Sequence, residues 1–158
     1  MTSSSTTSTS PLPARTPVLI AGGGPVGLTV AALLAQQGIA STVIEADSSF
    51  CDGSRAICMS RRSLEILGWI GADKPMLDKG LSWVGGRSYF RDREVLHFEM
   101  PAEPTQRFGP MVNIQQYYAE EFAHDAAIAT GLVDVRWSTR VSNVTPHGNG
   151  NTVEVTSA

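Results

Sequence analysis

The residues best suited to chemistry are the glycines of a short turn close to the amino terminus. Gly22, Gly24 and Gly27 stand in the segment G-G-G-P-V-G, which has the pattern G-x-G-x-x-G. In a dinucleotide-binding fold the first glycine permits a tight turn, the second lets the backbone approach a pyrophosphate, and the third lets a helix pack close to a sheet. The spacing therefore predicts a phosphate-binding turn.

The helix expected after this turn would supply the rest of the pyrophosphate site. N–H groups in the first turn of a helix, together with the positive end of its dipole, attract anionic groups. We therefore assign Gly24, Pro25 and Val26 to the cofactor site. Because proline has no N–H to donate, Pro25 contributes through shape, and it suits the first helical position.

A carboxylate follows at the position expected for a ribose ligand. Glu45 lies 18 residues after Gly27, and Ala46 comes directly after it. A carboxylate there accepts hydrogen bonds from the hydroxyls of an adenosine ribose and repels a 2′-phosphate, so NADP is disfavoured in this site. Both residues are assigned to the cofactor site. The alternative is a structural glycine-rich turn, with Glu45 at a solvated strand end.

The elements around these residues read as strand, helix, strand. The apolar run 18–21 predicts a central parallel strand covered on both faces. A helix is expected from Pro25 to Gln37, with Gly38 as its cap, and a second strand over 41–45. This order is the context that the glycine pattern requires, and it predicts an α/β fold with a Rossmann-type βαβ unit.

Further along, the chain alternates polar and structured stretches. Residues 48–59 are polar and turn-rich, and Ser60 then predicts the cap of a helix that ends close to Gly71. A short helix is possible over 73–79. Two β-rich runs within 82–100 predict an antiparallel hairpin.

The last part of the chain predicts one helix and two strands. Asn113 resembles an N-cap with Gln116 three residues later, opening a helix that reaches Gly131. Strands are expected over 133–137 and 153–156, with a turn of H-G-N-G before the second.

Three stretches together carry a resemblance to a known family. They are G-G-G-P-V-G-L at 22–28, G-S-R-A-I-C-M-S-R-R-S-L-E-I-L-G at 53–68, and N-I-Q-Q-Y-Y-A-E-E at 113–121. In this order they resemble the amino-terminal region of the single-component FAD-dependent aromatic hydroxylases, the flavoprotein monooxygenases that include para-hydroxybenzoate and phenol hydroxylases. The resemblance covers about residues 17–158 and implies FAD as the dinucleotide.

The resemblance also implies further cofactor ligands. In that family the arginine of the R-A pair lies along the FAD, which corresponds to Arg55, and the glutamine that opens the later helix contacts the cofactor, which corresponds to Gln116. A backbone group of the following strand reaches the adenine, which implicates Val141. Arg55 as an ordinary loop arginine, and Gln116 as the capping partner of Asn113, are the alternatives.

The chemistry implied for the whole enzyme is hydroxylation of a phenolic ring. NAD(P)H reduces the flavin, which then uses O₂, while the protein positions the substrate and excludes water. The family's later Asp-Gly and Gly-Asp flavin motifs are not found here, so we expect a truncated protein and assign no catalytic residue. Three parts are expected: a Ser/Thr-rich disordered tail over 1–16, an incomplete FAD-binding domain over 17–158, and within it a β-hairpin segment over 81–108 toward the substrate region.

Net charge, hydrophobic run length and cysteine spacing disfavour several other classes of function. A net charge of −3 offers no basic surface for nucleic acid, and no apolar run is long enough for a membrane span. Cys51 and Cys58 lack the spacing of a zinc or redox motif and predict reduced thiols in a cytoplasmic protein. A small nucleotide-binding module without redox turnover stays open as the alternative function, whereas an NAD-dependent dehydrogenase would leave Arg55 and Gln116 unexplained.

Overall fold

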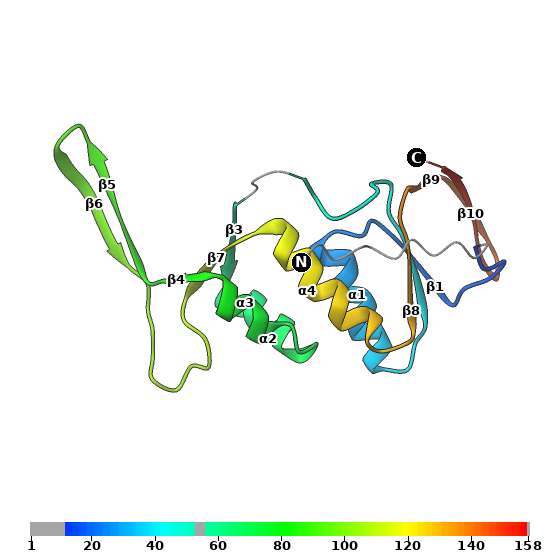
Figure 1. Cartoon of the computed structure of the whole chain (residues 1–158), viewed down its shortest axis with the longest axis horizontal. Helices are drawn as coiled ribbons and strands as arrows, with labels where there is room; N and C mark the ends of the chain where they lie inside the picture. Colours follow the sequence, from blue (N-terminus) through cyan, green and yellow to red (C-terminus); the bar gives the residue numbers. More distant parts are fainter. Residues whose placement is uncertain (1–11, 53–55, 158) are drawn as a thin grey trace.

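The computed structural model describes residues 12–52 and 56–157 (Figure 1). The expected tail over 1–16 therefore lies mostly outside the described residues. A three-stranded parallel sheet organises one half of the molecule. It contains β1 (Val18–Ala21), β2 (Ser41–Ile44) and β8 (Val133–Arg136) in the order β1-β2-β8. All three had been predicted as strands, and the α/β class is confirmed.

The sequence prediction was wrong about which strand is central. All four residues of β2 are buried, whereas β1 lies at the edge of the sheet and its residues are half-buried or exposed. An apolar run indicates a strand but does not show how many neighbours it has. Here β8, which lies far along the chain, pairs with β2 and not with β1, and this makes β2 the central strand.

Two helices pack together on one side of this sheet. They are α1 (Pro25–Gln36), with Gly38 beyond its end at φ +74°, and α4 (Gln116–Ile128). Figure 1 shows them side by side, with their amino-terminal ends at the same end of the molecule. Small side chains let the two backbones approach closely; the buried alanines of these helices are Ala31, Ala32, Ala35, Ala119, Ala123 and Ala127.

A second, antiparallel sheet extends this core. Its strands are β3 (Ala56–Ser60), β7 (Met111–Gln115) and β4 (Leu81–Trp83), in the order β3-β7-β4. The sequence prediction of a turn-rich stretch over 48–59 is thus wrong for its last residues. β3 pairs with β7 along its whole length, and that partner is too distant in sequence for local composition to reveal it.

The two short helices before β4 agree with the sequence. They are α2 (Arg61–Trp69) and α3 (Asp73–Lys79). Ser60 caps α2 as predicted, since its hydroxyl accepts a hydrogen bond of 3.3 Å from Ser63 N. Gly71, at φ +78°, follows the helix end.

The predicted N-cap at Asn113 is wrong. Asn113 lies within β7, where its Oδ1 accepts a hydrogen bond of 2.9 Å from Trp83 Nε1 of β4. Helix α4 begins at Gln116, with Gln115 as an N-cap that makes no side-chain capping bond. Because the Asn113 side chain is hydrogen-bonded to the neighbouring strand, Asn113 and Gln116 do not form a capping box.

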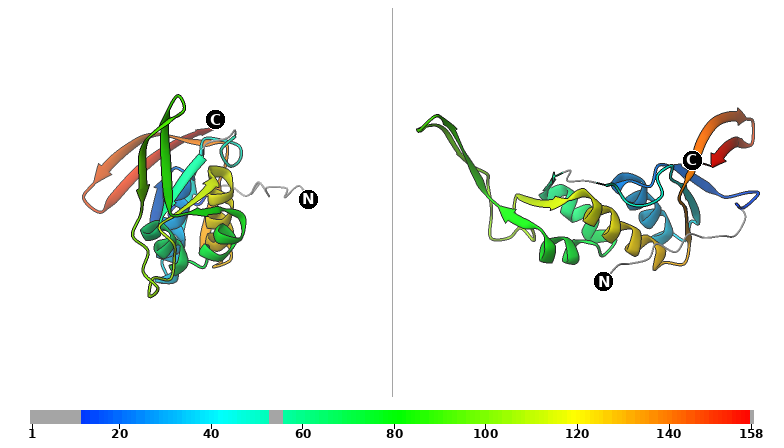
Figure 2. Two further views of the ribbon diagram at one scale, coloured as in Figure 1. Left: turned by 90° about the vertical axis from the view of Figure 1, so that its left-hand side faces the viewer. Right: turned by 45° about the horizontal axis from the view of Figure 1, so that its top comes forward.

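Two hairpins leave the body of the molecule. The predicted hairpin consists of β5 (Gly85–Phe90) and β6 (Arg93–Glu99) and projects away from the helices (Figure 2). The other consists of β9 (Thr139–His147) and β10 (Gly150–Ser157), of which the sequence predicted only 153–156. Strand β9 contains Pro146 in an exposed stretch, a residue that weakens any strand prediction.

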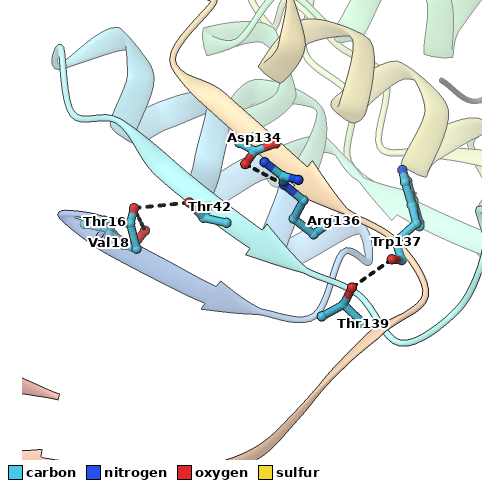
Figure 3. A network of polar contacts seen from close by, with 7 residues as sticks. All are labelled: Thr16, Val18, Thr42, Asp134, Arg136, Trp137 and Thr139. Atoms are coloured by element: carbon cyan, nitrogen blue, oxygen red, sulfur yellow. Dashed lines mark hydrogen bonds and ion pairs between the residues drawn. The ribbon is translucent and has the colours of Figure 1, made fainter. Parts of the chain in front are cut away.

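Side-chain hydrogen bonds tie neighbouring segments to the parallel sheet (Figure 3). Thr42 Oγ1 donates to Thr16 Oγ1 at 3.2 Å, and Thr16 Oγ1 donates to the carbonyl of Val18 at 3.0 Å. On β8, Arg136 Nε lies 2.7 Å from Asp134 Oδ2. The threonine bonds fix the start of β1 against β2, whereas the Arg136–Asp134 contact lies within β8.

Candidate cofactor site

The candidate site lies at the carboxyl edge of the parallel sheet, where three chain segments meet. Gly22 N donates to the carbonyl of Ile44 at 2.8 Å, which joins the end of β1 to the end of β2. Glu45 N donates to the carbonyl of Arg136 at 2.8 Å, and Thr139 N donates back to the carbonyl of Glu45 at 2.8 Å. In open α/β sheets ligands bind outside this edge.

The three glycines of the turn have different physical reasons to be glycine. Gly22 has φ +109°, a conformation that strains any residue with a Cβ. A Cβ on Gly27 would lie 2.0 Å from the carbonyl oxygen of Gly22, so no side chain fits there. A Cβ on Gly24 would meet no atom within 4 Å, and its φ of −73° suits any residue. The fold therefore explains Gly22 and Gly27 but not Gly24.

The open space at Gly24 coincides with the start of α1. Gly24 is the N-cap of this helix, and it provides no side-chain hydrogen bond to the first turn. Pro25 occupies the first position, Val26 is 77% exposed, and the first turn carries no acidic residue. This end of α1 thus has N–H groups and dipole available to an anion, with no Cβ in the way, so the residues present fit a pyrophosphate.

Glu45 is tied to the glycine turn by its own carboxylate. Its Oε2 accepts a hydrogen bond of 2.6 Å from Gly23 N, and its Oε1 accepts one of 2.9 Å from Asp47 N. A carboxylate has about four acceptor positions, so these two bonds leave capacity for ribose hydroxyls. Glu45 thus lies beside the turn, and the half-buried Ala46 follows it in the chain.

Sequence reasoning missed Gly23, although it stands between the predicted residues. Gly23 is buried, and a Cβ there would lie 3.0 Å from Cβ of Glu45. The missing side chain lets Glu45 approach the backbone of the turn. The signal available in the sequence was a glycine at the second position of G-x-G-x-x-G, where the fingerprint allows any residue.

Gln116 lies at the start of α4 and is held by the buried acid Glu120. Gln116 Nε2 donates to Glu120 Oε1 at 2.8 Å, and Cys51 N donates to Glu120 Oε2 at 2.7 Å. Glu120 is 3% exposed. The sequence analysis did not single it out; its spacing of four from Gln116 on a helix was the available signal.

Of the two remaining predicted ligands, the structure describes only Val141. Arg55 lies outside the described residues. Val141 lies in β9, two residues after Thr139, the residue that is hydrogen-bonded to Glu45, and it pairs with Val155 of β10. Together with Leu19 of β1 it lines a groove of about 750 Å³ between the sheet edge and the β9–β10 hairpin.

Two adjacent tyrosines on α4 have shifted pKa values. A hydrogen bond with Lys79 lowers the pKa of Tyr118, and a hydrogen bond with Tyr118 raises the pKa of Tyr117. Lys79 Nζ also lies 4.3 Å from the centroid of the Tyr118 ring. This contact joins α3 to α4 and stands apart from the glycine turn.

The described residues hold neither a cluster of metal ligands nor a membrane-spanning helix. Within 12–52 and 56–157 no cluster of three or more His, Cys, Asp or Glu residues could hold a metal ion. No helix in this described part is long and apolar enough to cross a membrane.

The geometry of the glycine turn and its neighbours defines the class of protein. A parallel strand, a glycine turn, a helix with an open amino-terminal end and a second strand ending in a carboxylate make up an α/β unit of the kind that binds dinucleotides. The family model described as "FAD binding domain" matches residues 15–158. The chain belongs to this FAD-binding family, which confirms the family resemblance and identifies FAD as the dinucleotide its members bind.

Individual relatives agree with this assignment. The chain is 32% identical over 157 residues to a 3-(3-hydroxy-phenyl)propionate/3-hydroxycinnamic acid hydroxylase of Mycolicibacterium smegmatis, covering 90% of this chain and 25% of that protein. It thus spans about a quarter of the length of the curated relatives it matches.

Solved structures show the same fold. The anhydrotetracycline hydroxylase OxyS of Streptomyces rimosus matches with a TM-score of 0.75 and 26% identity, over 89% of this chain and 28% of that one. The flavin-dependent monooxygenase PieE, solved with FAD and substrate, matches with a TM-score of 0.77 and 22% identity, over 90% of this chain and 27% of that one.

Proposed function

We propose that this chain binds the ADP half of FAD at the carboxyl edge of its parallel sheet. The observation that carries the proposal is Gly24, whose missing side chain serves neither the backbone conformation nor the internal packing. A ligand that approaches the backbone closely accounts for it. The match to the FAD binding domain family names that ligand.

The residues divide the cofactor among them. Gly24, Pro25 and Val26 would bind the pyrophosphate through the start of α1, and Glu45 would accept hydrogen bonds from the ribose. Beyond these, we propose Arg55, Gln116 and Val141 as further FAD contacts; the support is the resemblance of 53–68 and 113–121 to the aromatic hydroxylases and, for Gln116, its tie to the loop that follows Glu45.

For the protein as a whole we propose NAD(P)H-dependent hydroxylation of a phenolic substrate. The support for the phenolic substrate is the M. smegmatis relative, whose name specifies a hydroxylase of 3-(3-hydroxy-phenyl)propionate and 3-hydroxycinnamic acid. In such a reaction one atom of O₂ enters the ring, the other leaves as water, and NAD(P)H supplies the two electrons. FAD, when bound, supplies the redox chemistry, and the chain described here supplies its binding and orientation.

We also propose that the protein is cytoplasmic. The support is the spacing of Cys51 and Cys58, which fits neither a zinc nor a redox motif and predicts reduced thiols.

A ligand competition tests the binding proposal. FAD is titrated into the purified chain and followed by flavin fluorescence anisotropy, after which ADP or FMN is tested against it. Because the proposed site contacts the ADP half, ADP should displace FAD, and FMN should bind at least about tenfold more weakly, the effect of about 1.4 kcal/mol. Equal binding of FMN, or no flavin binding at all, would contradict the proposal.

A further inference from the structure

The buried carboxylate of Glu120 connects two parts of the proposed site. It is 3% exposed and lies on α4, one turn after Gln116. Its two oxygens accept hydrogen bonds from neutral donors, one from the Gln116 amide and one from the Cys51 backbone N–H. Burying a carboxylate is unfavourable unless hydrogen bonds compensate it. If position 120 only filled space in the core, a neutral side chain would be more stable there.

The first consequence concerns the side-chain amide of Gln116. Its Nε2 donates to Glu120 Oε1 at 2.8 Å, so Gln116 turns its NH₂ group toward Glu120. Its carbonyl oxygen and second N–H are the groups left for another partner.

The second consequence concerns the loop that follows β2. This loop starts at Glu45 and reaches Cys51, whose N–H lies 2.7 Å from Glu120 Oε2. The contact joins residues 69 positions apart in the sequence. One carboxylate thus holds the loop against the same helix end that presents Gln116.

We propose that Glu120 is a positioning residue of the cofactor site, which selects the orientation of the Gln116 amide and fixes the loop after Glu45 against α4. This inference rests on the proposed binding of FAD and on the proposed contact of Gln116 with it. Glu120 touches the cofactor only through these neighbours.

The substitution Glu120→Gln keeps both contacts and inverts the polarity of the one to Gln116. The oxygen of the new amide can still accept from Cys51 N, so its NH₂ group faces Gln116. Gln116 must then turn its carbonyl toward position 120 and present its NH₂ group to the site. With this inverted polarity we expect the Kd for FAD to rise about tenfold. The matched control is Glu121→Gln, which removes the same charge one residue further along α4 and should leave the Kd unchanged.

A double variant distinguishes positioning from a merely structural role. Gln116→Glu combined with Glu120→Gln restores a carboxylate-to-amide bond between the two side chains with the roles exchanged, which is stronger than the amide-to-amide bond of the single variant, and it keeps the bond to Cys51. Its Tm should return toward that of the wild type, while its FAD affinity stays low because position 116 no longer has an amide. This variant also serves if Glu120→Gln alone unfolds.

Each outcome of the titrations has one meaning. A weakened Glu120→Gln variant and a double variant with recovered Tm but low affinity support the positioning role. Wild-type affinity in Glu120→Gln, or an affinity that follows Tm in both variants, overturns it. If the wild-type chain itself does not bind FAD, the proposed function fails, whereas unchanged binding in Glu120→Gln affects only the role of Glu120.

Discussion

Gly24 offers a way to separate folding from cofactor binding with one methyl group. In Gly24→Ala the added Cβ meets no atom within 4 Å, and φ of −73° is ordinary for alanine. Alanine is a poorer N-cap than glycine, but it lowers the conformational entropy of the unfolded chain, and the two effects are of similar size. We expect the free energy of unfolding to change by less than about 1 kcal/mol.

The same methyl group should weaken FAD binding strongly. It would occupy space that the pyrophosphate needs close to the backbone, and overpacking of this kind costs about 1–3 kcal/mol. About 2 kcal/mol corresponds to a Kd roughly thirtyfold higher. Urea unfolding of the apoprotein measures the first quantity, and anisotropy titration with FAD measures the second.

Gly27→Ala is the matched comparison, because the same change is made three residues later. Here the Cβ would lie 2.0 Å from the carbonyl oxygen of Gly22 and 3.3 Å from Cγ2 of Ile20, so the backbone must move. We expect a loss of stability of at least about 3 kcal/mol. If Gly24→Ala binds FAD like the wild type, or unfolds as easily as Gly27→Ala, the division of roles between the two glycines is wrong.

Three further substitutions test other parts of the structure. Glu45→Ala should weaken FAD binding and also lower stability by about 1–2 kcal/mol in urea unfolding, because two backbone N–H groups lose their acceptor; an unchanged stability would contradict the structural half of its role. Lys79→Met should raise the pKa of Tyr118 toward its ordinary value, since the lysine hydrogen bond that lowers it is removed; a near-ultraviolet absorbance titration in which tyrosine ionisation does not move to higher pH would refute this cause. Ser60→Ala should cost about 1 kcal/mol through loss of the α2 cap, and thermal unfolding identical to the wild type would show that the cap contributes nothing.

Sequence reasoning succeeded where the determining interactions are local. The strand, glycine turn and helix from Val18 to Gln36 follow from apolar runs, a first-turn proline and a terminal glycine, and Ser60 caps α2 as expected. It failed at β3 and at Asn113, because β3 needs β7 as its partner and Asn113 is engaged by Trp83 of another strand. Neither contact leaves a periodic pattern in the surrounding residues.

By itself, the sequence determined the glycine turn and the acid that follows β2. Their causes lie within a few residues or along one strand–helix unit: a positive φ at Gly22 and a Cβ-free approach at Gly27. Only the tertiary structure decided what these residues contact. Glu45 reaches back to Gly23, and Glu120 reaches Cys51 across 69 positions. A short-range pattern cannot specify such pairs, because the distance between them is set by the packing of whole elements.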